Sequence, residues 1–175
     1  MMRVGLDTSA INWFADNPGS ATTFLARRGA GEFTVVVTPE VAEEIRKTPD
    51  EERRALLKAA LSQYFPLATT HLGRAGSAVA GLTIAATRQS EAQFDALARV
   101  RDGWDRTHLI NAARHSCDVF LTRDKELYLK RRDEIQAIIG QIRIEHPQEF
   151  VAGLRMRTPN KALKLTHRLD RRLAA

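Results

Sequence analysis

Four acidic side chains occur in contexts that suit a shared site. Asp7 and Asp124 each end a short apolar run, and Glu44 and Asp105 each fall in a helical pattern. An open α/β sheet places its site at the carboxyl ends of its strands. Carboxylates gathered there repel one another unless a cation lies between them, and oxygen ligands suit a hard cation. The four residues therefore indicate a magnesium-dependent enzyme that cuts a phosphodiester bond.

Apolar runs and helical periodicity predict the elements that would position these acids. Strands are expected at residues 2–6, 33–37 and 119–121, with a last edge strand at 141–144. Helices are expected at residues 10–15, 20–28, from 39, at about 50–64, about 89–101, 105–115 and from 125. This alternation predicts a parallel sheet with helices on both faces, which is an α/β fold.

Several helix ends and faces can be predicted as well. Thr8 or Ser9 is expected to cap the first helix, and Ser20 the second. The helix at 50–64 is expected to bury one apolar stripe, formed by Leu56, Leu57, Ala60 and Leu61. Gly103 is expected to interrupt the helices on either side of it, and residues 66–88 give no clear pattern.

Composition restricts the class of protein. A chain of 175 residues with 43% hydrophobic residues fits one globular domain. No apolar run approaches the roughly 18–20 residues of a membrane span, and the first residues already form a strand pattern rather than a signal peptide. Cys117 is the only cysteine, which excludes an internal disulfide and a cysteine-rich zinc site. We expect a cytoplasmic protein.

The net charge of +6 is located at one end of the chain. Residues 155–175 contain seven basic residues and one acid, so residues 1–154 are neutral overall. A basic tail of this kind can attract polyanions through nonspecific phosphate contacts, and it can equally be a solvated extension without a role. The pI therefore gives no argument for RNA binding.

Three motifs together resemble those of the PIN-domain nucleases. They are LDTSAI at the start, T-P-x-V-A-x-E-I after the second strand, and D-x-x-H-L-I-x-A-A followed by C-D-V-F-L-T-x-D. The largest group of this family is the toxin ribonucleases of bacterial toxin–antitoxin modules. The resemblance covers roughly residues 2–150. It implies a Rossmann-like three-layer α/β/α fold with a short central parallel sheet, formed by residues 1–154, and leaves residues 155–175 as a basic tail.

The resemblance also implies an activity. The acidic quartet of the family carries over to Asp7, Glu44, Asp105 and Asp124, with Thr122 as the associated hydroxyl. One or two Mg²⁺ ions, or Mn²⁺, would activate a water and neutralise the charge of the transition state. Asp7 and Asp105 are expected as direct ligands, with Asp124 next. The implied substrate is single-stranded RNA, and the implied partner is a cognate antitoxin. Apolar helices in the N-terminal half would suit a homodimer or an antitoxin groove, and they would equally suit a core.

Each acid also has a structural interpretation. Asp7 could start a helix, and Asp124 could cap one. Asp105 could be an acid near the start of a helix, where it interacts favourably with the helix dipole. Glu44 could be a solvated surface acid, or a neighbouring glutamate could take its place. A match of all four to one family pattern favours the site.

Other residues near the acids have two interpretations each. Thr122 could bond a carboxylate or a substrate phosphate, or satisfy backbone groups, and Ser9 is a secondary candidate for a site hydroxyl. His108 could be a general base or, as we favour, a packed or hydrogen-bonded helix histidine. Arg123 and Lys125 could contact phosphate or remain solvated. The nearby aromatic residues are expected in the core: Trp13, Phe14 and Trp104.

Two further classes of function are open to such a chain. A catalytically silent PIN-like module would bind RNA or a protein, although it would have no need of four acids. An unrelated α/β phosphate-handling enzyme is the other class. The familiar nucleotide-binding versions of it are excluded, because the sequence has neither a G-x-x-x-x-G-K-[ST] loop nor a G-x-G-x-x-G loop.

Overall fold

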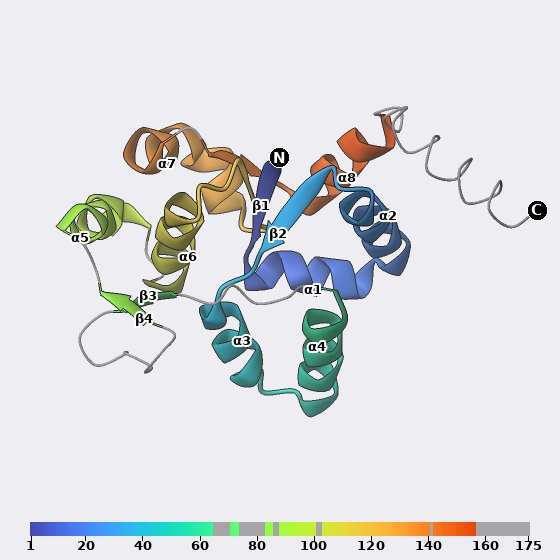
Figure 1. Cartoon of the computed structure of the whole chain (residues 1–175). Coiled ribbons are helices and arrows are strands. Elements are labelled where there is room, and N and C mark those ends of the chain that lie inside the picture. Colours follow the sequence, from blue (N-terminus) through green and yellow to red (C-terminus); the bar gives the residue numbers. More distant parts are fainter. Residues whose placement is uncertain (65–70, 74–82, 86–87, 101–102, 141, 157–175) are drawn as a thin grey trace, which may run out of the picture.

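A four-stranded parallel sheet forms the centre of the protein (Figure 1). The computed structural model describes residues 1–64, 71–73, 83–85, 88–100, 103–140 and 142–156. The strands are β1 (Met2–Leu6), β2 (Phe33–Val36), β5 (Val119–Leu121) and β6 (Arg143–Glu145). They lie in the order β2-β1-β5-β6, and every neighbouring pair is parallel.

The register of the strands aligns their carboxyl ends. Leu6 of β1 is the partner of Leu121 of β5, which in turn is the partner of Glu145 of β6. The residues that follow these strands are therefore neighbours along one edge of the sheet. Asp7 follows β1, and Thr122 follows β5. The predicted site residues at strand ends thus lie at the edge where open α/β sheets place their sites.

Helices cover both faces of the sheet, which confirms the expected three-layer α/β architecture. One face is covered by α1 (Thr8–Asp16), α2 (Pro18–Gly29) and α8 (Pro147–Met156), and the other by α6 (Gly103–Arg114) and α7 (Arg132–Ile139). The helix α5 (Arg88–Ala96) packs against α6 and α7. Each face of the sheet has its own hydrophobic core, and the side chains of β5 alternate between them. Val119 and Leu121 pack with α1, α2 and α8, whereas Phe120 packs with α6 and α7. Short turns of 3₁₀ helix (Leu97–Arg99) and π-helix (Glu126–Lys130) adjoin α5 and α7.

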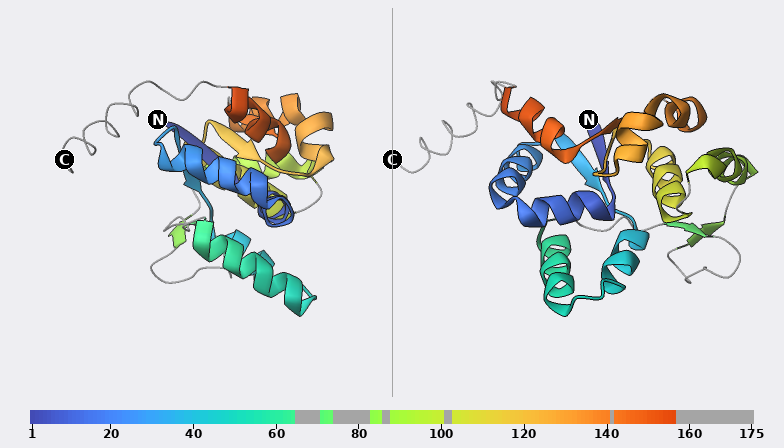
Figure 2. Two further views of the ribbon diagram at one scale, coloured as in Figure 1. Left: turned by 90° about the vertical axis from the view of Figure 1, so that its right-hand side faces the viewer. Right: turned by 180° about the vertical axis from the view of Figure 1, so that it is seen from behind.

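Two helices project beyond this arrangement. Figures 1 and 2 show α3 (Pro39–Arg46) and α4 (Glu51–Tyr64) beyond α1, on the side of the carboxyl ends of the strands. α4 packs against both α1 and α3. Its buried stripe is narrower than predicted, because Leu57, Ala60 and Leu61 are buried whereas Leu56 is 47% exposed. One narrow face of α4 is enough to contact two neighbouring helices.

Several element boundaries differ from the prediction. α1 begins at Thr8 with Asp7 as its N-cap, so neither Thr8 nor Ser9 is the cap. α2 begins at Pro18 rather than after Ser20, because proline suits the first helical position. Gly103 begins α6 instead of interrupting a helix.

Other parts of the chain had no predicted element. The helix α8 follows His146 and ends at Met156. It therefore continues two residues beyond residue 154, the expected end of the nuclease domain. Residues 157–175 of the expected basic tail lie outside the described residues. Within residues 66–88, β3 (His71–Gly73) and β4 (Thr83–Ala85) form a parallel pair. Among the described residues, no helix combines the length and apolar character that crossing a membrane requires.

Candidate functional site

Asp7 is a buried carboxylate at the carboxyl end of β1. Its backbone N–H donates to the carbonyl of Leu121 at 3.2 Å, which continues the pairing of β1 with β5. Its Oδ1 accepts hydrogen bonds from the backbone N–H of Ala10 at 2.7 Å and from Ser9 Oγ at 2.9 Å. The residue is 4% exposed. The structural role considered for Asp7, as the start of a helix, is therefore real, and it fixes the orientation of the carboxylate.

Burial raises the pKa of Asp7, although hydrogen bonds from Thr122, Ala10 and Ser9 and the charge of His108 lower it. The ionised form is therefore poorly stabilised by the protein alone. A buried carboxylate with a raised pKa becomes stable when it takes up a proton or when a cation binds beside it.

Thr122 connects the strand ends to Asp124. It is fully buried, and its Oγ1 lies 3.3 Å from Ser9 Oγ and accepts the backbone N–H of Asp124 at 3.0 Å. Oδ1 of Asp124 in turn accepts the backbone N–H of Glu126 at 2.7 Å. Asp7, Ser9, Thr122 and the loop carrying Asp124 thus form one polar network. One carboxylate oxygen of Asp124 is used to start the π-helix, as its capping interpretation predicted.

Glu44 is held by two residues from different elements. Thr8 Oγ1 donates to its Oε2, and His108 Nε2 lies 3.1 Å from the same oxygen. Burial tends to raise the pKa of Glu44, but the hydrogen bond and charge of His108, together with the hydrogen bond of Thr8, lower it overall. Glu44 is therefore ionised and oriented, and it is not the solvated surface acid of the alternative interpretation.

His108 is a buried histidine among carboxylates. It is 3% exposed, and burial alone would lower its pKa. The hydrogen bond and charge of Glu44, with the charges of Asp7 and Glu40, raise the pKa overall. The raised pKa favours the protonated imidazole, whose charge offsets part of the repulsion among Glu44, Asp7 and Glu40.

Asp105 lies in the first turn of α6, one turn before His108. α6 ends at Arg114, and Asp118 shortly afterwards donates its backbone N–H to the carbonyl of Arg3, near the start of β1. The helix thus runs opposite to the strands, and its first turn points to the carboxyl edge of the sheet. The topology brings Asp105 to the same edge as Asp7.

The four predicted acids are related in different ways. Asp7 and Glu44 share His108 as a charged neighbour, Asp124 is linked to Asp7 through Thr122 and Ser9, and Asp105 is placed by topology. Within the described ranges, no three or more His, Cys, Asp or Glu side chains are grouped so that they could hold a metal ion. The convergence of all four acids on one ion therefore stays a prediction.

His108 is buried and hydrogen-bonded to Glu44, as the favoured interpretation predicted. The sequence analysis underestimated Glu40, which is 7% exposed and acts on His108 through its charge. Glu40 lies in the first turn of α3, one turn before Glu44. That spacing places both glutamates on one helix face, so the sequence already indicated that Glu40 lies beside Glu44.

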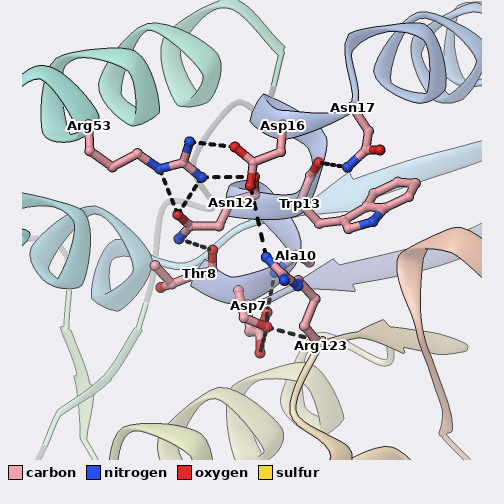
Figure 3. A network of polar contacts seen from close by, with 10 residues as sticks. Asp7, Thr8, Ala10, Asn12, Trp13, Asp16, Asn17, Arg53 and Arg123 are labelled. Atoms are coloured by element: carbon pink, nitrogen blue, oxygen red, sulfur yellow. Dashed lines mark hydrogen bonds and ion pairs between the residues drawn. The ribbon is translucent and has the colours of Figure 1, made fainter.

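Basic residues flank this edge of the sheet. Figure 3 shows Arg53 reaching from α4 to α1, where its guanidinium donates to Asn12 Oδ1 at 2.9 Å and to Asp16 Oδ1 at 2.5 Å. Arg123 Nη1 lies 3.9 Å from the other oxygen of Asp16, and the Arg123 backbone N–H donates to Ser9 Oγ at 2.7 Å. Arg53 therefore anchors α4 to α1, whereas Arg123 adjoins the network around Asp7.

Comparisons with known proteins add little. The sequence matches no protein-family model and no curated protein. Among solved structures, the chain is similar to a chain of VapBC2 from Rickettsia felis bound to a DNA fragment from their promoter. The TM-score is 0.49 and the identity 13%, over 83% of this chain and 98% of that chain. At so low a similarity, activity has to be argued from the residues of this chain itself.

Proposed function

We propose that this protein is a Mg²⁺-dependent endoribonuclease, with Mn²⁺ as an alternative ion. The observation that carries the proposal is the state of Asp7. Its carboxylate is buried at the carboxyl end of a central strand, its orientation is fixed by Ala10 and Ser9, and its pKa is raised by burial. A buried, preorganised carboxylate that lacks sufficient positive charge is typical of a functional site.

The available donors suit a hard cation. Asp7 and Glu44 supply carboxylate oxygens, and Thr8, Ser9 and Thr122 supply hydroxyls close to them. Mg²⁺ uses one or two protein carboxylates and keeps several waters, so it does not require a compact group of three ligands. We assign Asp7 and Asp105 as direct ligands, with Asp124 and Glu44 holding bound waters. When bound, the ion would lower the pKa of a water and neutralise charge on the phosphate.

The residues of the chain have distinct roles in this proposal. Ala10 and Ser9 hold the Asp7 carboxylate in one orientation, so no reorganisation is needed when substrate binds. Thr122 fixes the loop that carries Asp124. His108 supplies a positive charge beside Glu44, which limits repulsion among the acids.

We further propose that the protein acts as the toxin of a toxin–antitoxin pair, with a cognate antitoxin as its partner. This role is supported by the resemblance of the three sequence motifs to those of toxin ribonucleases. A small antitoxin gene beside the gene for this chain would support it, and coexpression of that antitoxin should suppress RNA cleavage.

A catalytically silent RNA- or protein-binding module is the second candidate. It is favoured by one observation: Oε2 of Glu44 is already engaged by His108 and Thr8. In that case His108 would serve permanently as the cation of the acidic edge, by which we mean the carboxyl edge of the sheet with Asp7, Glu44, Asp105 and Asp124.

Cleavage of single-stranded RNA by purified protein tests the proposal. The variant Asp7→Asn keeps a side chain that caps helices well, so it should remain folded while losing the anionic oxygen. We expect Mg²⁺-dependent cleavage to fall at least about 100-fold. Asp133→Asn is the matched control, because its carboxylate is 90% exposed and it lies in α7. Equal cleavage by the wild type and Asp7→Asn, or no cleavage by the wild type, would refute the nuclease function.

A further inference from the structure

We propose that a cavity between α1, α2 and α8 binds one nucleobase of a single-stranded RNA, a few nucleotides from the phosphate that is cut. The cavity has a volume of about 410 Å³, which is within the range of small-molecule sites. This inference rests on the proposed function, because it identifies the region of that substrate which the site recognises. It adds a binding subsite that is separate from the acidic edge.

The lining of the cavity suits a base. Trp13 belongs to the hydrophobic core, as expected, and is 9% exposed, so it offers only part of its ring to a base in the cavity. The amides of Asn17 and Gln148 and the hydroxyl of Ser20 can bond the edge of a base. Among the described residues that line the cavity, Arg155 is the only ionisable one, and its charge suits an adjacent phosphate. The combination of one indole, several neutral polar groups and one guanidinium favours a nucleotide.

In the part of the chain that the structure describes, the aromatic rings beside Trp13 meet it edge-on. The rings of Phe14 and His146 meet it at 72° and 76°, with centroids at 5.2 and 6.0 Å. Asn17 Nδ2 donates to the Trp13 carbonyl at 2.8 Å, which places both residues on one side of the last turns of α1. Figure 3 shows the Trp13 ring on the side of α1 away from Arg53.

The cavity lies close enough to the acidic edge for one strand to reach both. Asp7 and Trp13 are separated by six residues of α1, which correspond to about 9 Å of helix rise. Stacked nucleotides advance roughly 3.4 Å each, so about three nucleotides span this length. Arg123 lies between the two regions, since its backbone contacts Ser9 and its side chain approaches Asp16. Its charge is available to an intervening phosphate.

An apolar side chain of a protein partner is the rival occupant. Ala152 and the other aliphatic residues of α8 in the lining would accept one. The hydroxyl of Ser20, the amide of Gln148 and the guanidinium of Arg155 would then face a group that offers them no hydrogen bond, and covering polar groups without hydrogen bonds is costly. The chemistry of the lining therefore favours the nucleobase.

A matched pair of substitutions tests the proposal. Ala152→Phe places a ring in the cavity, whereas Gly153→Phe places the same ring on the next residue of α8, where a Cβ meets no atom within 4 Å. Both are made in the full chain carrying Asp7→Asn, so that binding is measured without cleavage. Affinity for a fluorescent single-stranded RNA is measured by anisotropy. Circular dichroism melting verifies folding.

We expect Ala152→Phe to weaken RNA binding by about 5- to 100-fold, as the loss of one stacked base does, and Gly153→Phe to bind as the parent does. In a Trp104→Phe background, RNA should also quench the fluorescence of Trp13, and Ala152→Phe should remove this quenching. If Ala152→Phe does not fold, Gln148→Ala serves in its place. Gln148 is exposed, and its loss should weaken binding and alter the preference among AMP, GMP, CMP and UMP.

Equal affinity of the parent, Ala152→Phe and Gln148→Ala for RNA would overturn the proposal and leave the cavity to a protein side chain. An absence of RNA binding by every variant would overturn it as well. The two proposals can fail separately. RNA binding that depends on Ala152 without any cleavage by the wild type would refute only the nuclease function. Cleavage by the wild type, together with RNA affinity that is unchanged by the cavity substitutions, would refute only the subsite.

Discussion

Replacement of His108 by glutamine should destabilise the protein in a pH-dependent manner. The imidazole is 3% exposed, and its Nε2 lies 3.1 Å from Glu44 Oε2. Its pKa is raised by Glu44, Asp7 and Glu40 in spite of burial. Glutamine has no titratable group, but it can keep a hydrogen bond to Glu44. The substitution therefore removes the charge while preserving much of the packing.

The expected loss of stability follows from the distance between His108 and Glu44. Two unit charges 3.1 Å apart attract by about 5 kcal/mol at an effective dielectric constant of 20, before the cost of desolvation. Removal of one partner of a buried pair typically costs about 3–5 kcal/mol. Since glutamine retains a hydrogen bond, we expect a loss of about 3 kcal/mol in the free energy of unfolding.

The sign of the pH dependence is fixed by the direction of the shift. The pKa of His108 is above its ordinary value of 6.5 in the folded protein, so the folded state binds this proton more tightly than the unfolded state. The stabilisation is complete below pH 6.5 and is lost as the pH rises through the folded-state pKa. The lowered pKa of Glu44 keeps that partner ionised at mildly acidic pH. The difference between wild type and variant should thus be largest near pH 6 and much smaller near pH 9.

Urea unfolding of wild type and His108→Gln at pH 6 and pH 9 provides the measurement. Comparison of the two proteins cancels the other titrating groups, including His146, whose pKa is lowered mainly by burial. A difference that is the same at both pH values would show that the imidazole is neutral in the folded protein. That result would refute the electrostatic account of the acidic edge.

Two further predictions concern the packing around β1. Gly5→Ala should lower the free energy of unfolding by about 1–3 kcal/mol in urea titrations, because its Cβ would lie 3.2 Å from Cys117 Sγ and 3.3 Å from Phe120 Cδ2. Gly19→Ala, whose Cβ meets open space, is the control and should not destabilise. Burial raises the pKa of the Cys117 thiol to about 12, so iodoacetamide at pH 8 should label it only after unfolding. Rapid labelling of the folded protein would contradict this burial.

The sheet was predictable from the sequence because its strands are short apolar runs with clear ends. Residues 2–6 and 119–121 form strands as expected, and this places Asp7 and Thr122 at one edge. Thr8 or Ser9 was predicted as the N-cap, with Asp7 considered as an alternative start of the helix, because three consecutive polar residues compete for this position. Only the tertiary position of the strand end decides among them. The helix α8 was not predicted, although Pro147 suits the first position of a helix.

The contacts within the site were less predictable. Pairing of Glu44 with His108 depends on how α3 packs against α6, and these helices are 64 positions apart at this contact. Periodicity shows that each residue lies on a helix, but it gives no information on which helix faces which. The capping role of Asp124, by contrast, follows from its place between a strand and a helix, and was considered from the sequence.

Titration calorimetry with Mg²⁺ tests the central claim most directly. The claim is that Asp7 and its neighbours form a site for a divalent cation at the carboxyl edge of the sheet. We predict that the wild type and Asp133→Asn take up the ion alike, and that Asp7→Asn binds it far more weakly. No uptake by the wild type, or the same uptake by all three proteins, would contradict the account.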